Sequence, residues 1–151
     1  MENQAESFAL PQWQELPGFG LYLDQVLGLT AAAWGTAAAP LTAGMVNSYV
    51  KSGLVERPEK KKYSRAALAQ LIMITFLKQT SSMDSLQALL HPADGTDAEE
   101  IYTRFLLGYR EVNVFLSEHP ELTGLDCALA AAVCQTRVRT ATEGQETAPQ
   151  L

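Results

Sequence analysis

The sequence has few of the residue types from which catalytic and metal sites are built. It contains two histidines and two cysteines, and it has no P-loop, no G-x-G-x-x-G, no G-x-S-x-G and no Cys/His ligand set. His91 and His119 each stand directly before a proline, where a place at a helix end is the ordinary explanation. We therefore expect no enzymatic activity, no cofactor and no metal. A cation held by His91, Asp94 and Asp97 is a weak alternative, because their spacing matches no specific metal motif.

The chain also lacks a long apolar run and a targeting segment at its start. Its most apolar stretch, residues 68–77, is far too short to span a bilayer and lies between Arg65 and Lys78. The first residues contain neither an Arg-rich amphipathic leader nor a basic region followed by an apolar one. We therefore expect a cytoplasmic protein without a membrane span.

The two cysteines are too far apart to form a disulfide with each other. Cys127 and Cys134 lie in an Ala-rich helical stretch, about 10 Å apart along one helix face. That separation exceeds the reach of a disulfide. We expect buried, reduced thiols that pack as small apolar groups, and a redox or metal pair is the less favoured alternative.

Positive charge is scarce in this chain, and it is concentrated. Residues 42–78 contain seven Lys/Arg and two acids, a net charge of +5, whereas the remaining residues contain four Lys/Arg and fifteen acids, a net charge of −11. Such asymmetry is typical of a compact anion-binding surface on an acidic body. The alternative is a charged loop that is merely solvated.

Length and patterning predict one main domain with a helical appendage. At 151 residues and 47% apolar, the chain can bury a sizeable core. The polar stretch HPADGTD, residues 91–97, is the clearest break in the helical pattern. We expect a disordered arm over residues 1–10, a domain over 11–92, a C-terminal helical subdomain over 97–139 and a mobile tail over 140–151.

Apolar spacing predicts six helices, which we place at about residues 21–34, 42–52, 64–78, from 81 or 82, 98–118 and 125–138. The third is apolar nearly all round and is therefore expected at the centre of the core. In the second, Thr42 is a suitable N-cap and Gly53 a suitable residue after the C-terminus. Residues 54–55 and 62–63 predict two very short strands around Pro58, a hairpin that we call the wing.

This order of parts resembles a known DNA-binding domain. The string T-x-x-x-V-N-S-Y-V-K-S-G-L-V, followed by P-x-x-x-x-Y-S-R-x-x-L, resembles the DNA-binding domain of MerR-type regulators. The run from LPQWQELPGFGLYLDQV through MVNSYVKSGLVERPEKKKYSRAALAQLIMITFLKQ resembles more closely a bacterial family catalogued as domain of unknown function 1836, over about residues 10–90. The resemblance implies a mainly α fold: a MerR-like winged helix-turn-helix with a small two-stranded β wing, plus a C-terminal helical pair.

On this resemblance, helix 42–52 lies in the major groove of double-stranded DNA and wing 54–63 contacts phosphate. The residues implied to contact DNA are Thr42, Gly44, Asn47, Ser48, Lys51, Arg57, Lys60, Lys61, Lys62, Tyr63 and Arg65. Asn47 is the first candidate for a base contact, since its amide can pair with adenine. Packing explains Tyr63 equally well, and an ion pair with Glu59 explains Arg65.

We accordingly expect a homodimeric DNA-binding transcriptional regulator. The sequence assigns no small-molecule effector. The alternative is a protein-interaction module that keeps the same fold and uses the polar helix face for another protein, because fold alone does not establish function.

Overall fold

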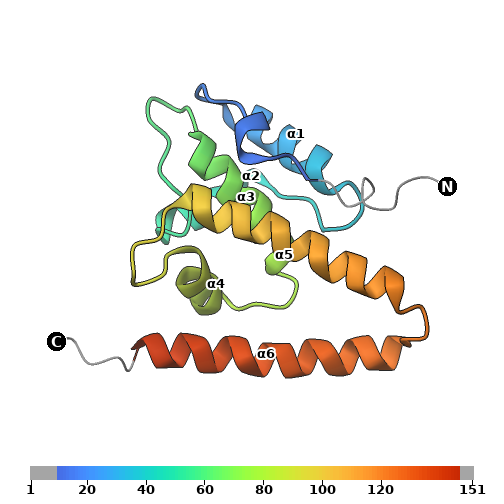
Figure 1. Ribbon diagram of the computed structural model, residues 1–151. Helices are drawn as coiled ribbons and strands as arrows, with labels where there is room; N and C mark the ends of the chain where they lie inside the picture. The colour runs from blue at the N-terminus through green and yellow to red at the C-terminus, as the bar shows by residue number, and fades with distance from the viewer. Residues whose placement is uncertain (1–9, 147–151) are drawn as a thin grey trace.

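The computed structural model describes residues 10–146, so the predicted arm lies outside it except for Leu10, as do residues 147–151 of the predicted tail. The described part is helical (Figure 1). Its elements are the 3-10 turn η2 (Trp13–Glu15) and the helices α1 (Leu23–Trp34), α2 (Ala43–Lys51), α3 (Arg65–Leu77), α4 (Met83–Leu90), α5 (Ala98–Glu118) and α6 (Gly124–Glu146). All six predicted helices are present, and α6 continues beyond its predicted end near residue 138.

Side-chain caps mark the start of four helices. Thr42, Ser64, Ser82 and Asp97 each accept a hydrogen bond from the backbone N–H three residues further on, at 3.3, 3.1, 3.1 and 2.9 Å. Each cap satisfies one of the four N–H groups that the first turn of a helix leaves without an intrahelical partner. These short polar side chains therefore explain why α2, α3, α4 and α5 begin where they do.

Helix α3 is the centre of the core, as the sequence predicts. Residues 67–75 are all buried, and α1, α4 and α5 pack against this helix. Its buried polar side chains have partners: the Thr75 hydroxyl donates to the Leu71 carbonyl at 2.7 Å, and the Gln70 side-chain oxygen accepts the Glu56 N–H at 2.9 Å. The helix is therefore buried without leaving these groups unpaired.

An aromatic cluster joins α1, α3 and α5. The ring of Trp34 stacks on that of Phe76 with centroids 4.5 Å apart, and Tyr109 meets both rings edge-on at 5.4 Å. Phe105 adds a further edge contact to Trp34 at 6.2 Å. Edge-to-face and offset arrangements at these distances are favourable for aromatic rings. The cluster fixes how the first half of α5 lies on α3.

Helix α6 lies beside the domain rather than inside it. Figure 1 shows that it turns back from the end of α5 and passes below α4, which it contacts. None of its residues whose burial is described is buried. Cys127 and Cys134 are free and exposed, so the expectation of buried thiols is wrong, because no other element covers the face that carries them.

The predicted β wing does not form, and the winged helix-turn-helix fold with a two-stranded wing is therefore wrong. The structure has no β-strand within residues 10–146; it has two isolated bridges, Leu21 with Tyr63 and Glu59 with Lys62. Without this wing, the structure does not support the MerR-like part of the sequence interpretation. What remains correct is the mainly α class with a C-terminal helical pair.

Hydrogen bonding explains why the two predicted strands do not pair. The N–H groups of Leu54 and Val55 both donate to the Tyr49 carbonyl, at 3.0 and 3.2 Å, and so complete the end of α2. On the other side, Tyr63 exchanges two backbone hydrogen bonds with Leu21, at 2.7 and 2.9 Å. The N–H groups of residues 54–55 and both backbone groups of Tyr63 therefore bond elsewhere in the fold, and they are not free to form a β-ladder with each other.

No described helix combines the length and the apolar character that crossing a membrane requires.

Candidate nucleic-acid interface

Helix α2 presents a polar face to solvent. Its apolar side chains Val46 and Tyr49 are buried in the core, and burial raises the pKa of the Tyr49 hydroxyl. The residues predicted for the opposite face are all exposed: Thr42, Gly44, Asn47, Ser48 and Lys51. The Ser48 hydroxyl donates to the Gly44 carbonyl at 3.1 Å, so one of its hydrogen-bonding positions is already occupied within the helix.

The chain leaves α2 through a turn that fixes the direction of the next segment. Gly53 has φ +79°, a left-handed conformation that glycine adopts without strain. The buried side chains of Leu54 and Val55 then hold the backbone against the domain. From Glu56 onward the chain returns to the surface, so the basic residues that follow are carried by a loop anchored at its start.

The basic turn, which we define as residues 57–62, exposes four cationic side chains: Arg57, Lys60, Lys61 and Lys62. Glu59 and Lys62 exchange two backbone hydrogen bonds of 2.9 and 3.0 Å across its tip. Lys60 and Lys61 have φ +49° and +67°, the pattern of a type I′ turn, in which Asn-Gly is preferred. Two lysines there cost about 1–2 kcal/mol each in backbone strain.

The segment just before α1, residues 18–22, packs against the basic turn. The backbone pair between Leu21 and Tyr63 places Gly20 directly against Lys62, where a Cβ on Gly20 would lie 2.7 Å from that of Lys62. The Lys62 ammonium lies over the Tyr22 ring at 5.6 Å, a favourable cation–π distance. Tyr63 is buried, which is the packing role that the sequence left open for it.

Arg65 is held at the base of the turn and is half-buried. Its guanidinium lies over the Trp13 ring at 5.7 Å, and a Cβ on Gly18 would lie 2.6 Å from one of its nitrogens. Its Nε is buried without a hydrogen-bond partner among residues 10–146. Arg65 is thus tied to the segment before α1 and differs from the exposed lysines of the turn.

A cleft of about 490 Å³ separates that segment from the basic turn. Four cationic residues (Arg57, Lys60, Lys62 and Arg65) and two acidic ones (Glu56 and Glu59) line it, with Gly18, Phe19, Gly20, Tyr63 and Ser64. The lining therefore has a net charge of +2. Phe19, 68% exposed, is a contact candidate that the sequence analysis missed, although an aromatic residue between two glycines is a visible signal.

Residues 91–97 do not form a metal site. His91 Nε2 lies 2.8 Å from the Leu54 carbonyl, Asp94 accepts hydrogen bonds from Thr96, and Asp97 caps α5. The described residues contain no group of three or more His, Cys, Asp or Glu side chains placed to hold a metal ion. Asp94 and Asp97 are thus used in local structure, whereas His91 contacts the distant turn after α2.

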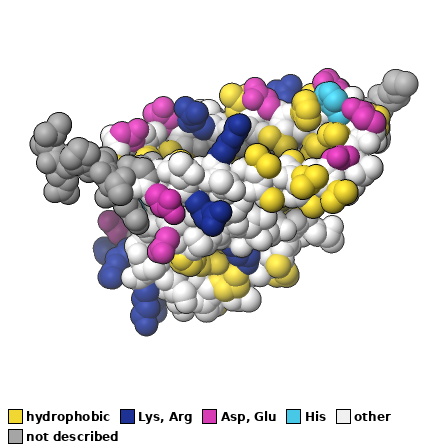
Figure 2. Space-filling view, turned by 90° about the horizontal axis from the view of Figure 1, so that it is seen from below, with side chains coloured by type: hydrophobic (Ala, Val, Ile, Leu, Met, Phe, Trp, Pro, Cys, Tyr) yellow, Lys and Arg dark blue, Asp and Glu magenta, His cyan; other side chains and the backbone are white. Residues whose placement is uncertain are grey.

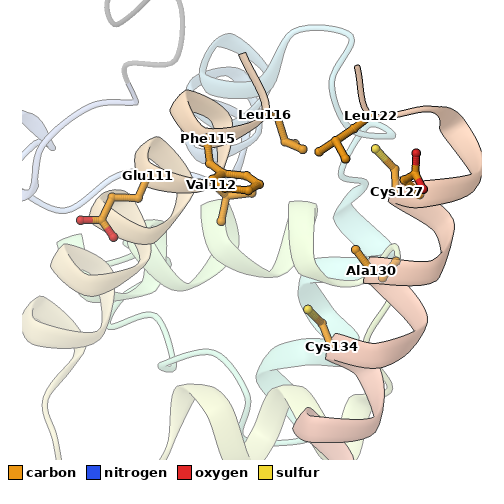
Figure 3. A pocket seen from close by; sticks show the side chains of 10 residues that line it. Glu111, Val112, Phe115, Leu116, Leu122, Cys127, Ala130 and Cys134 are labelled. Carbon is orange, nitrogen blue, oxygen red and sulfur yellow. The ribbon is translucent and has the colours of Figure 1, made fainter. Parts of the chain in front are cut away.

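A second hollow lies at the other end of the molecule, between α5 and α6, and it is apolar. This groove has a volume of about 790 Å³ (Figure 3). Its lining residues are Glu111, Val112, Phe115, Leu116, Leu122, Asp126, Cys127, Ala130, Ala131 and Cys134. Apart from Glu111 and Asp126, the lining side chains are apolar groups or thiols, so the groove has the character of a contact surface.

The part of the chain that carries the basic turn matches the model of a protein family. The family described as a domain of unknown function (DUF1836) matches residues 11–105. The chain belongs to this family. The DUF1836 region runs from just before η2 into α5 and includes α2, the basic turn and the cleft, whereas the α5–α6 groove lies beyond it. No curated protein and no solved structure matches the chain.

Proposed function

We propose that this protein is a DNA-binding transcriptional regulator that contacts double-stranded DNA with the exposed face of α2 and the basic turn. The observation that carries the proposal is the set of exposed cationic residues at and shortly after the end of α2: Lys51, Arg57, Lys60, Lys61 and Lys62. Phosphate contacts by several Lys/Arg side chains supply most of the affinity of proteins for DNA.

The two parts of this surface have different tasks. The lysines of the basic turn bind the phosphate backbone and so orient the protein on the duplex, without reading sequence. An α-helix fits the major groove, and on α2 the exposed Asn47 has the donor and acceptor that pair with adenine. Gly44 next to it lets the helix approach a base closely. The proposal needs no β wing.

Backbone strain in the turn supports a functional role for its lysines. Lys60 and Lys61 hold left-handed conformations that Asn and Gly adopt at lower cost. Strained backbone is concentrated at sites where a particular side chain is needed at a particular place. At the tip of this turn the feature that lysine supplies is exposed positive charge.

A second candidate function is binding of another protein through the same face of α2. The observation that favours it is the net charge of −11 outside residues 42–78, which repels DNA unless it lies away from the basic turn. The two candidates differ in their response to salt, because binding through several phosphate contacts weakens steeply as salt increases.

The test is selection of bound fragments from a random duplex library, followed by titration of the selected sequence against salt. The expected result is an enriched motif with a steep salt dependence. Replacing Lys61 and Lys62 by alanine should weaken binding to every sequence and reduce the salt slope by about 2. The matched control replaces two exposed arginines of α5, Arg104 and Arg110, by alanine and should change neither. If no motif is enriched and the protein shows no salt-dependent DNA binding even at low salt, the DNA-binding proposal fails. The protein-binding function is then the better candidate.

A further inference from the structure

Helix α6 is apolar on its outer side as well as toward α5. Leu125, Leu129 and Val133 recur every four residues and form a stripe, which we call the outer stripe, and their side chains are 70%, 57% and 58% exposed. A helix with apolar residues on most of its faces is normally buried. Figure 2, seen from the α6 side, shows hydrophobic side chains gathered toward the end where α5 meets α6.

The α5–α6 groove has the shape that such a stripe requires. On the α5 side its wall consists of large side chains, Val112, Phe115 and Leu116. On the α6 side the lining is small: Cys127, Ala130, Ala131 and Cys134 (Figure 3). The small residues leave room for leucine-sized side chains from outside, and the large ones supply contact area.

The stripe and the groove also match in length and charge. Val133 lies eight positions after Leu125, about 12 Å along the helix, and the α6 lining of the groove, from Cys127 to Cys134, is of similar length. One turn beyond Val133, Arg137 continues the four-residue spacing of the stripe. The charged residues that line the groove, Glu111 and Asp126, are both acidic.

The exposed apolar area is that of an interface. The large side chains of the outer stripe, the groove wall and Leu122 together expose on the order of 700 Å², and a reciprocal contact would cover both surfaces of each copy. A standard interface buries about 800 Å² on each partner. This surface is therefore large enough to hold two chains together.

We propose that the groove is occupied by the outer stripe of α6 from a second copy of this chain, and that the arrangement is reciprocal. The stripe and one side of the groove are both on α6, so a two-fold axis between the two copies of this helix brings each stripe to the other copy's groove and closes the assembly as a dimer, whereas a head-to-tail contact without that axis would give larger assemblies. The two α5–α6 hairpins then form a four-helix arrangement. The dimer does not depend on DNA binding, and it leaves α2 and the basic turn uncovered.

The experiment is sedimentation equilibrium of the full chain over a concentration series. The wild-type protein is expected to be dimeric and the Leu129→Glu variant monomeric, because a carboxylate buried in a groove whose charged lining residues are Glu111 and Asp126 is strongly unfavourable. Leu107→Glu is the matched control: Leu107 is 56% exposed, like Leu129, but does not line the groove. It should remain dimeric.

A second variant tests the groove rather than the stripe. Ala130→Trp fills the groove from its own floor and is expected to be monomeric, with the helical circular dichroism of the wild type, because α6 is exposed in the single chain. A wild-type protein that stays monomeric at every concentration would overturn the proposal. So would dimers that persist in both Leu129→Glu and Ala130→Trp, and so would a monomeric Leu107→Glu control.

Discussion

The indole N–H of Trp34 donates a hydrogen bond of 2.8 Å to the carbonyl of Ile72, and so ties the end of α1 to the middle of α3. The two residues are 38 positions apart, and Trp34 is buried. The same indole stacks on Phe76. One side chain therefore supplies both a long-range polar contact and the centre of the aromatic cluster.

Replacing Trp34 by phenylalanine should destabilise the protein by about 2 kcal/mol, because the buried hydrogen bond is lost and a small cavity is left beside Phe76. Urea unfolding followed by circular dichroism measures this difference. Trp13→Phe is the control: Trp13 is only half-buried, and its replacement should cost clearly less. Equal losses at the two positions would show that the cluster around Trp34 is not the more important contact.

The stability contribution of Tyr102 should depend on pH. Its hydroxyl donates to the Pro11 carbonyl at 2.6 Å. Burial, with a smaller contribution from the negative charge of Glu15, raises the pKa of Tyr102 to about 12, above the value of about 10 in an unfolded chain. The folded state thus favours the neutral phenol. This contribution is complete below pH 10 and is lost as the pH rises from 10 toward 12.

The measurement compares wild type with Tyr102→Phe by urea unfolding at several pH values. At pH 8 the variant should be less stable by about 1 kcal/mol, the value of one hydrogen bond. Above pH 10 the wild type alone loses the stability linked to this hydroxyl, so the difference should narrow. A difference that stays constant up to pH 11 would show that the hydroxyl is not protected by burial.

The helices could be predicted from the sequence because their signals are local. The caps Thr42 and Ser64 and the apolar pattern of residues 68–77 each act within one or two turns, and the structure confirms the helices they predict. The pairing of residues 54–55 and 62–63 could not be predicted in this way. Both segments have strand-like composition, but their hydrogen-bond partners, Tyr49 and Leu21, are decided by the tertiary fold.

The candidate interface was predictable as a list of residues but not as an arrangement. The exposed positions of α2 follow from helical periodicity, and Lys60 to Lys62 follow from charge. The positive φ of Lys60 and Lys61 leaves no such signal, since composition alone favours Asn and Gly there. The exposure of Cys127 also has no local signal, because an Ala-rich helix looks the same whether or not another element covers it.

Asn47→Ala should relax sequence preference rather than abolish DNA binding. Because its amide is the proposed base contact, the variant should lose about 1–3 kcal/mol of discrimination at one base pair and keep its affinity for unrelated duplexes. Alanine favours the helix, so α2 stays folded. Affinities for the selected sequence and its single base-pair variants measure this. Ser48→Ala, on the same exposed face, is the control and should change less. An equal loss on all sequences would contradict a base-reading role.

The strain in the basic turn leads to a prediction in which stability and binding change in opposite directions. Replacing Lys60 by Asn and Lys61 by Gly installs the pair that prefers positive φ at both positions. The variant should gain about 1 kcal/mol of stability, since the left-handed backbone no longer carries the full cost of its Cβ and side-chain clashes. It should also bind DNA more weakly, with a salt slope smaller by about 2, because two phosphate contacts are lost.

The control replaces both lysines by alanine. Alanine removes the same two charges but keeps a Cβ, so the backbone strain remains while the positive charge does not. Its DNA affinity should therefore fall as far as that of the Asn-Gly variant, without the gain in stability. If both variants bind DNA as the wild type does, the basic turn does not contact phosphate. If Asn-Gly is no more stable than Ala-Ala, the positive φ values of Lys60 and Lys61 impose no cost, and the strain argument for their function fails with them.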